Sequence, residues 1–323
     1  MKVKRVRITK EKREGKVGLI LTILLFFCVF PVLMSNFSES EKETINLEHT
    51  AGQVWVLQRK FWGSIQIPLE EYLVGMLASS IPAEYETETL KAQAILLRSF
   101  CMSQMTKEDG KKIISDETIK EYYLNESQRK NLWTNQYETY EKKILQAVSE
   151  TKGILVAYEG KIMNPPFFRL SNGNTRNILE YISTPGELAY LKSVPCEEDK
   201  KASDYIQYTE MTQKELEKVL KKRILKKNEK IEKLVLCKDN NGYVKEVEIN
   251  GEKIDGEIFR EAFHLPSSSF VLEKVNHIIE IQTKGIGHGF GFSQYEANQL
   301  AKEGKGYEEL LLYFYENISF EKI

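Results

Sequence analysis

Two repeating patterns of hydrophobic and polar positions run along this chain, one with the period of a helix and one with the alternation of a strand. A pair of short strands is predicted on either side of Gly63, in the segments VWVLQ and SIQIPL. A helix is predicted over residues 70–79 and ends before Pro82. A second helix is predicted to begin near Thr87, with one apolar stripe formed by Leu90, Ala94, Leu97 and Cys101.

The central part of the chain is predicted to contain a helical region followed by a β-hairpin. Residues 116–150 have a helical pattern, and their core candidates are Tyr122, Tyr123, Leu132 and Trp133. The hairpin is predicted over residues 154–163, because the Glu159-Gly160 pair separates two strand-like runs.

The last third of the chain mixes both kinds of element. Thr212 and Glu215 form a Thr-x-x-Glu pattern, which is typical of a capping box at the start of a helix. Strands are predicted over 234–237 and 243–249, and helices over about 293–303 and 307–315. Because strands and helices are mixed without regular β-α alternation, the predicted fold class is α+β.

The most hydrophobic segment is VGLILTILLFFCVFPVLM, residues 17–34, in which only Thr22 is polar. Its 18 residues come close to the ~20 that are needed to cross the hydrocarbon core of a bilayer. The basic residues before it predict a cytoplasmic N-terminus and an extracytoplasmic body, by the positive-inside rule. A cleaved signal peptide is the alternative, although no small-x-small cleavage site follows the run.

The predicted organisation is a basic cytoplasmic tail (1–16), a transmembrane signal anchor (17–34), a tether (35–52) and one extracytoplasmic domain (53–323). The composition, with 41% hydrophobic and 29% charged residues, suits a folded core and argues against disorder. Residues 1–34 hold eight Lys/Arg and two Glu, which leaves 38 basic and 45 acidic residues in the remainder. An acidic body argues against nucleic acid as a partner. Because of the predicted signal anchor, we expect a single-pass protein of the cell membrane.

Between Ile67 and Phe100 the chain reads IPLEEYLVGMLASSIPAEYETETLKAQAILLRSF. This segment resembles the opening motif of the stage II sporulation protein D / amidase enhancer (SpoIID/LytB) family, in which P-L-E-x-Y-L-x-G precedes A-L-K-A-Q-A. The positions that match are Pro68, Leu69, Glu70, Tyr72, Gly75, Ala78, Pro82, Leu90, Lys91, Ala92, Gln93, Ala94 and Arg98. Three later segments, 144–175, 190–200 and 285–315, resemble further motifs of the family in the same order.

The resemblance implies peptidoglycan as the ligand. Sporulation members of the family resemble lytic transglycosylases that cut bare glycan strands during engulfment, and related members modulate wall amidases. The implied partners are peptidoglycan glycan strands, together with a wall hydrolase or another sporulation membrane protein. No cofactor is implied.

Ser80 stands where the family has its catalytic Glu. Cutting a glycosidic bond requires a carboxylic acid that protonates the leaving oxygen, and a serine hydroxyl is no acid at any relevant pH. Loss of general-acid catalysis costs ~10²–10⁴ in rate. Two hypotheses remain open. The first is a catalytically silent protein that engages peptidoglycan or a partner hydrolase. The second is an active lytic transglycosylase whose acid is Glu84, four residues further on, or another carboxylate.

The remaining candidate site residues come mostly from the later motifs. In GIGHGFGFSQYEA, residues 285–297, His288 and Gln294 are predicted to bind sugar hydroxyls, and Tyr295 to stack on a sugar face. The alternative is a tight strand-to-helix crossing in which His288 has a structural role. The resemblance also assigns substrate binding to Gln93, Arg98, Ser171, Asn172, Thr175 and Ser293.

No metal site is predicted. The family often has His at the position of Arg169, which is a poor metal ligand, and no second His lies near it in the sequence. Cys196 is interpreted as a packed thiol and not as a nucleophile.

Overall fold

The computed structural model describes residues 54–60, 63–108, 111–119, 123–223 and 233–323. All of them belong to one compact unit, Gly52–Ile323. The predicted tail, signal anchor and tether lie outside the described residues, as does Tyr122. Within the described part, no helix combines the length and the apolar character needed to cross a membrane.

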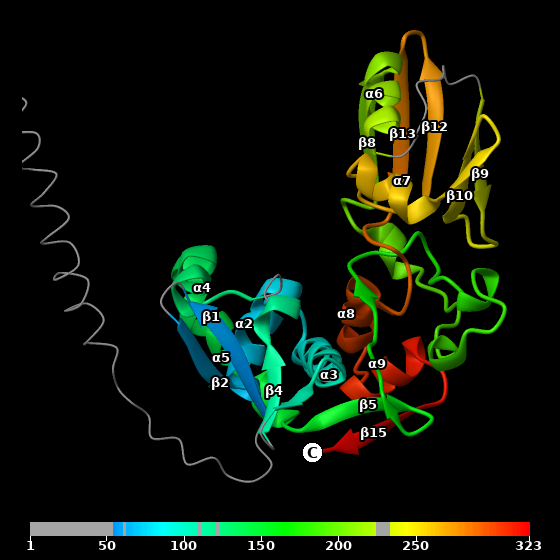
Figure 1. Ribbon diagram of the computed structural model, residues 1–323. Helices are drawn as coiled ribbons and strands as arrows, with labels where there is room; N and C mark the ends of the chain where they lie inside the picture. Colours follow the sequence, from blue (N-terminus) through cyan, green and yellow to red (C-terminus); the bar gives the residue numbers. More distant parts are fainter. Residues whose placement is uncertain (1–53, 61–62, 109–110, 120–122, 224–232) are drawn as a thin grey trace, which may run out of the picture. The chain divides into compact units, whose positions relative to one another are not determined.

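Three helices that contact one another form the core of the N-terminal half (Figure 1). They are α2 (Leu69–Ser80), α3 (Thr87–Ser103) and α5 (Tyr137–Glu150). The predicted helices over 70–79 and from Thr87 are confirmed, and so is the stripe on α3: Leu90, Ala94, Leu97 and Cys101 are all 0% exposed. The small side chains of Ala92 and Ala94 let neighbouring elements pack closely against α3.

A four-stranded sheet with the order β2-β1-β4-β3 packs beside α2. Its strands are β1 (Val54–Lys60), β2 (Gly63–Pro68), β3 (Thr106–Glu108) and β4 (Lys111–Ser115). β1 and β2 are antiparallel, with Lys60 opposite Gly63 and Trp55 opposite Pro68, which confirms the predicted strand pair.

The helical region predicted over 116–150 is divided in the structure. It contains the 3-10 turn η2 (Asp116–Thr118), the helix α4 (Glu126–Trp133), the 3-10 turn η4 (Thr134–Gln136) and then α5. Asn125 and Gln128 form a capping box that starts α4, and Thr134 ends it with a φ of 45°. Trp133 is buried as predicted, whereas the prediction for Leu132 is wrong, because its side chain is 58% exposed.

A second core forms around the C-terminal helices α8 (Gln294–Lys302) and α9 (Tyr307–Phe314), which confirm the helices predicted there. The predicted hairpin is also confirmed as β5 (Ile154–Tyr158) and β6 (Lys161–Ile162), and β15 (Ile318–Lys322) pairs with β5 at the other edge (Figure 1). The strands β7 (Phe167–Phe168) and β14 (Phe292–Ser293) form a short parallel pair, and α8 begins directly after β14.

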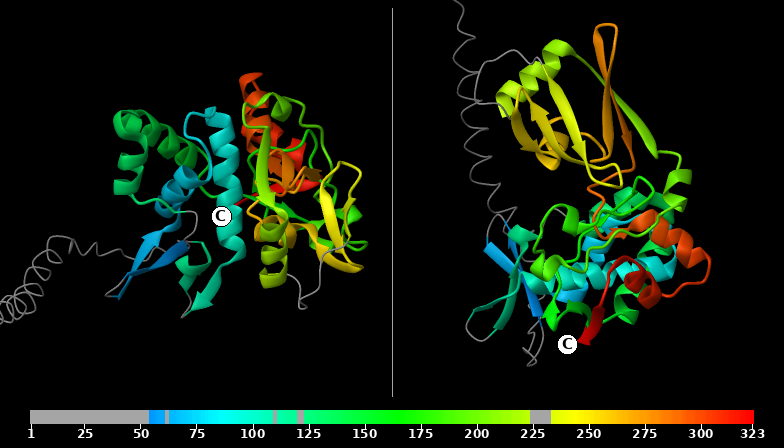
Figure 2. Two further views of the ribbon diagram at one scale, coloured as in Figure 1. Left: turned by 90° about the horizontal axis from the view of Figure 1, so that it is seen from above. Right: turned by 90° about the vertical axis from the view of Figure 1, so that its right-hand side faces the viewer.

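Two three-stranded sheets and two helices make up a lobe with a hydrophobic core of its own, called here the β8–β13 lobe (Figure 2). The sheets have the orders β12-β13-β8 and β11-β10-β9. The elements are β8 (Ile206–Thr212), α6 (Gln213–Arg223), β9 (Leu234–Lys238), β10 (Val244–Ile249), β11 (Glu252–Asp255), α7 (Gly256–Ala262), β12 (Phe270–Val275) and β13 (Ile278–Lys284). Three 3-10 turns precede the lobe: η5 (Ile178–Glu180), η6 (Gly186–Leu188) and η7 (Glu198–Lys201).

The capping box predicted at the start of α6 is present, since Thr212 Oγ1 accepts from Glu215 N at 3.2 Å and Glu215 Oε2 accepts from Thr212 N at 2.8 Å. The strands predicted over 234–237 and 243–249 are confirmed as the antiparallel pair β9 and β10. Helices and strands are mixed along the described chain, so the predicted α+β class is confirmed.

Candidate functional site

The first turn of α8 is joined to the end of α2 by one side chain. Gln294 Nε2 donates to the main-chain oxygen of Ser80 at 2.7 Å and to Gln93 Oε1 at 3.1 Å. Both glutamines are buried, and Gln93 Nε2 has no partner among the described residues. The structure therefore brings together three of the predicted site residues, one each from α2, α3 and α8.

Ser80 is the last residue of α2 and is half-buried. Its hydroxyl donates to the carbonyl oxygen of Leu77 at 3.3 Å, within its own helix. Carbonyl groups in the last turn of a helix lack helical partners, and Gln294 supplies one for Ser80. The side chain at this position therefore offers a hydroxyl and no ionisable acid.

The Glu84 side chain is exposed in the segment between α2 and α3. The main-chain oxygens of Glu84 and Tyr85 both accept from Lys143 Nζ, which lies 3.2 Å from that of Glu84. Tyr85 is almost fully buried, and burial raises the pKa of its phenol to about 12. The segment is thus fixed by its backbone and by Tyr85, while the Glu84 carboxyl remains in solvent.

An exposed cation and a tyrosine lie near this segment. Tyr295 N donates to the carbonyl oxygen of Arg169 at 3.1 Å, and the positive charge of Arg169 is among those that act on Tyr85. Arg169 forms a 2.6 Å ion pair with Asp204, in which both side chains are partly exposed. A half-buried aromatic ring beside a solvent-facing charge can contact a sugar ring and its substituents.

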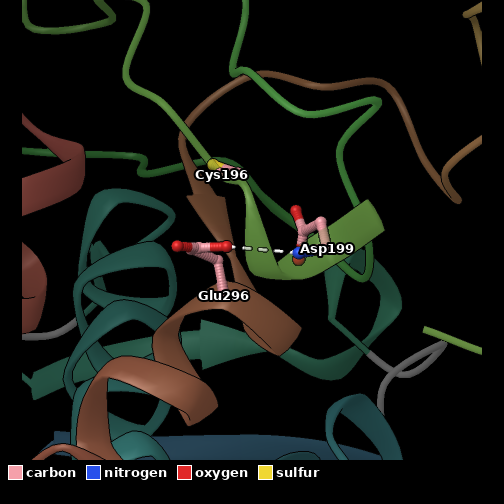
Figure 3. A group of neighbouring side chains, drawn as sticks. All are labelled: Cys196, Asp199 and Glu296. Carbon is pink, nitrogen blue, oxygen red and sulfur yellow. Dashed lines mark hydrogen bonds between the residues drawn. The ribbon is translucent and has the colours of Figure 1, made fainter. Parts of the chain in front are cut away.

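A pair of buried carboxyl groups connects η7 to α8 (Figure 3). Glu296 Oε2 accepts from the main-chain N–H groups of Glu198 at 2.9 Å and Asp199 at 3.2 Å. Asp199 Oδ2 in turn accepts from Ser171 N and Ser293 Oγ, both at 2.7 Å. Two predicted substrate-binding residues, Ser171 and Ser293, thus contact Asp199, and both are fully buried.

Both members of this carboxyl pair have raised pKa values. Burial raises the pKa of Asp199 to about 6. Burial, followed by the negative charge of Asp199, raises the pKa of Glu296 to about 7. The pair therefore retains a proton under mildly acidic conditions.

Cys196, Asp199 and Glu296 could each offer one ligand atom to a metal ion, and these atoms lie within 4.8 Å of one another. Burial, together with the two carboxylates, raises the pKa of the Cys196 thiol well above its ordinary value, so the sulfur carries its proton. One oxygen of each carboxylate already accepts hydrogen bonds. In this protonation state the three residues form a packed polar cluster, and the absence of a metal stays a prediction.

The loop that holds Asn172 and Thr175 is tied to its surroundings by hydrogen bonds. Thr175 Oγ1 donates to Lys192 O and accepts from Val194 N, both at 2.9 Å. Asn172 Nδ2 donates to Asn241 O at 2.7 Å and to Ser269 Oγ at 3.0 Å. Thr175 thus stabilises the loop, whereas Asn172 lines a cavity next to the β8–β13 lobe.

His288 belongs to a separate cluster around Arg176. Its carbonyl oxygen accepts from Arg176 Nη1 at 3.0 Å, and its Nδ1 accepts from the N–H of Phe290 at 3.1 Å. Burial lowers the pKa of His288 to about 4, so the imidazole is neutral near pH 7. None of its described contacts involves Ser80 or Gln294, which favours the structural interpretation of His288.

Arg98 lies outside the site, because it is 0% exposed and its guanidinium is paired with Glu70. Conversely, sequence analysis missed Tyr85, Asp199 and Glu296. Glu296 carried a weak signal, because it directly precedes Ala297 in the predicted helix over 293–303, and both positions are buried. A carboxylate at a buried helix position requires a polar partner from elsewhere in the chain.

Residues 58–158, which hold α2, α3 and α5, match the family model described as Stage II sporulation protein. The chain is 33% identical to Stage II sporulation protein D of Bacillus amyloliquefaciens over 79% of this chain and 75% of that protein. It is 34% identical to Stage II sporulation protein D of Bacillus subtilis (strain 168) over 77% of this chain and 73% of that protein. The chain belongs to the stage II sporulation protein D family.

Proposed function

We propose that this chain is a membrane-anchored protein of the sporulation protein D type that binds peptidoglycan glycan strands without cutting them. It would act outside the membrane, in engulfment or wall remodelling. The observation that carries the proposal is the position of Ser80, held by Gln294 at the place of the family's acid but without a carboxyl group.

The surroundings of Ser80 support binding. Tyr295 and Arg169 lie next to the α2–α3 connection. An aromatic ring and a solvent-facing cation are groups that contact sugar faces and acidic substituents.

Two buried carboxyls with raised pKa values, Asp199 and Glu296, have the protonation that a general acid needs. Glu296 is 5% exposed and its Oε2 accepts from two main-chain N–H groups, and Asp199 is 0% exposed. Burial of this kind keeps both groups from a glycosidic oxygen. They therefore serve the packing of η7 against α8.

The alternative function is an active lytic transglycosylase with Glu84 as the acid. It is favoured by one observation: Glu84 is exposed and lies in the segment that directly follows Ser80, near the same tyrosine and arginine. An exposed carboxyl lacks the apolar surroundings that keep a catalytic acid protonated at neutral pH.

The test uses the purified full-length chain in mild detergent with peptide-free glycan strands. Mass spectrometry measures 1,6-anhydro-muramyl ends for the wild type, Ser80→Glu and Glu84→Gln, and sedimentation with insoluble strands measures binding. We expect binding without anhydro products from the wild type, and products from Ser80→Glu.

Anhydro products from the wild type that disappear in Glu84→Gln would establish the alternative. If the wild type neither sediments with the strands nor cuts them, the proposed function is wrong.

A further inference from the structure

A cavity of about 480 Å³ lies between the Asn172 loop and the β8–β13 lobe. The residues that line it include Asn172, Lys200, Tyr205, Lys238, Gln282 and Lys284. The Tyr205 hydroxyl donates to Asn172 O at 2.8 Å, so the loop and the cavity wall are directly connected. This volume accommodates a ligand the size of a sugar residue or a dipeptide.

The described lining carries three lysines and no carboxylate. Lys200 is neutralised by Glu197, with Nζ 2.9 and 2.8 Å from the two carboxylate oxygens. Lys238 and Lys284 form no ion pair with any described residue. Partial desolvation, followed by the positive charge of Lys284, lowers the pKa of Lys238, and the charge of Asp239 acts in the opposite direction.

The carboxylate next to Lys238 in sequence, Asp239, accepts hydrogen bonds from other residues. Its Oδ2 accepts from the Tyr181 hydroxyl at 2.6 Å and lies 3.3 Å from Arg176 Nε. Its Oδ1 accepts from the main-chain N–H groups of Asn241 and Tyr243, at 3.0 and 2.8 Å. Asp239 therefore forms no ion pair with Lys238, and the described lining of the cavity offers no other carboxylate to the two lysines.

We propose that this cavity binds a carboxylate, with the anion held between Lys238 and Lys284. This inference rests on the proposed function, since peptidoglycan supplies carboxylates. One source is the lactyl carboxylate of a peptide-free muramic acid residue. The other is a carboxylate of the peptide stem.

Three probes separate these sources by isothermal titration calorimetry of the full-length chain in detergent. They are a peptide-free tetrasaccharide of alternating N-acetylglucosamine and N-acetylmuramic acid, fully N-acetylated chitotetraose (called chitotetraose below), and the free peptide Ala-D-Glu-diaminopimelate. Chitotetraose has the same backbone length and acetamido groups but no carboxylate. The variants are Lys238→Gln/Lys284→Gln and the control Lys274→Gln, an exposed lysine outside the cavity lining.

We expect the muramic tetrasaccharide or the peptide to lose at least about tenfold in affinity in the double variant, because the substitutions remove both cationic partners of the carboxylate. Lys274→Gln should leave the affinity for both anionic probes unchanged. The affinity for chitotetraose should be the same in the wild type and in both variants. Loss for the tetrasaccharide identifies the lactyl group as the source, and loss for the peptide identifies the stem.

Equal affinities of both anionic probes for the wild type and the double variant, or no binding of either, would overturn the cavity proposal. The proposed function is judged separately, by sedimentation with insoluble glycan strands. If sedimentation persists while the lysines have no effect, the chain binds glycan by another surface. The double variant is checked by its thermal unfolding, which should match that of the wild type because both lysines are exposed.

Discussion

Glu70 and Arg98 form a bidentate ion pair at the centre of the helical core, with Arg98 Nε and Nη2 at 2.8 and 2.7 Å from the two carboxylate oxygens of Glu70. The guanidinium also donates to the main-chain oxygens of Ile154 and Val148. It therefore joins α2 and α3 to the end of α5 and the start of β5. Both residues belong to the motif that identifies the family, and their contacts make them structural.

Glu70→Gln should lower the free energy of unfolding by about 3–5 kcal/mol, because it leaves the buried charge of Arg98 without its carboxylate. Urea unfolding followed by circular dichroism measures the change. Glu71→Gln, at the exposed neighbouring position of α2, is the matched control and should change stability little. Equal effects of the two variants would show that the ion pair does not hold the core together.

Stability should fall as pH rises from about 4 to 7. The folded-state pKa values of Asp199 and Glu296, about 6 and about 7, lie above their ordinary values of 3.8 and 4.5. The folded state therefore binds more protons than the unfolded state in this window, and the stabilisation present at low pH is lost as the pair ionises. The free energy of unfolding, measured at several pH values between 4 and 7, gives the slope of stability with pH.

Glu296→Gln isolates this contribution. The amide oxygen can still accept from the N–H groups of Glu198 and Asp199, while the negative charge is removed. We expect the variant to be more stable than the wild type above pH 7 by about 1–3 kcal/mol, and the two to converge below pH 4. Glu303→Gln, an exposed position just after α8, should leave the pH profile unchanged. A Glu296→Gln profile parallel to that of the wild type would contradict the raised pKa.

The His288 imidazole should not titrate between pH 5 and 8. Burial holds its pKa at about 4, whereas an unperturbed histidine has a pKa of ~6.5. Two-dimensional NMR of the ring nitrogens, with His288→Gln used to assign the signals, measures the protonation state directly. A midpoint near 6.5 would show that the ring reaches solvent and would restore His288 as a candidate sugar ligand.

Gly75→Ala should destabilise the N-terminal core by about 1–3 kcal/mol through overpacking. A Cβ at this position would lie 2.4 Å from Cε2 of Tyr123 and 2.6 Å from the carbonyl oxygen of Leu124. Ser79→Ala, on the exposed side of the same helix, is the control. Thermal unfolding gives the comparison, and an unchanged midpoint for Gly75→Ala would mean that the segment after residue 122 can move away from α2.

Local pattern was sufficient for elements whose stability comes from nearby residues. The helices α2 and α3 and the strand pair β9–β10 have their predicted positions, because apolar periodicity and turn residues determine them. The division of 116–150 was missed, since the break depends on the backbone of Thr134, and a periodic count of apolar positions carries no information about a positive φ.

The site was predictable only in part for a related reason. Ser80, Gln93 and Gln294 were named from motifs, and the structure brings them into contact. Asp199 and Glu296 meet across almost a hundred residues of chain, and no spacing rule connects them. Arg98 was assigned to the ligand because it lies in the motif, but a motif residue can serve the core as well as the site.

The bond between Gln294 and Ser80 uses the main-chain oxygen of Ser80, an atom that every amino acid possesses. The hydrogen bond that joins α2 to α8 therefore does not depend on which side chain occupies position 80. A substitution there can remove or introduce a carboxylic acid without altering the hydrogen bond between the two helices. The loss of an acid and the preservation of the helix junction are thus separable at this residue.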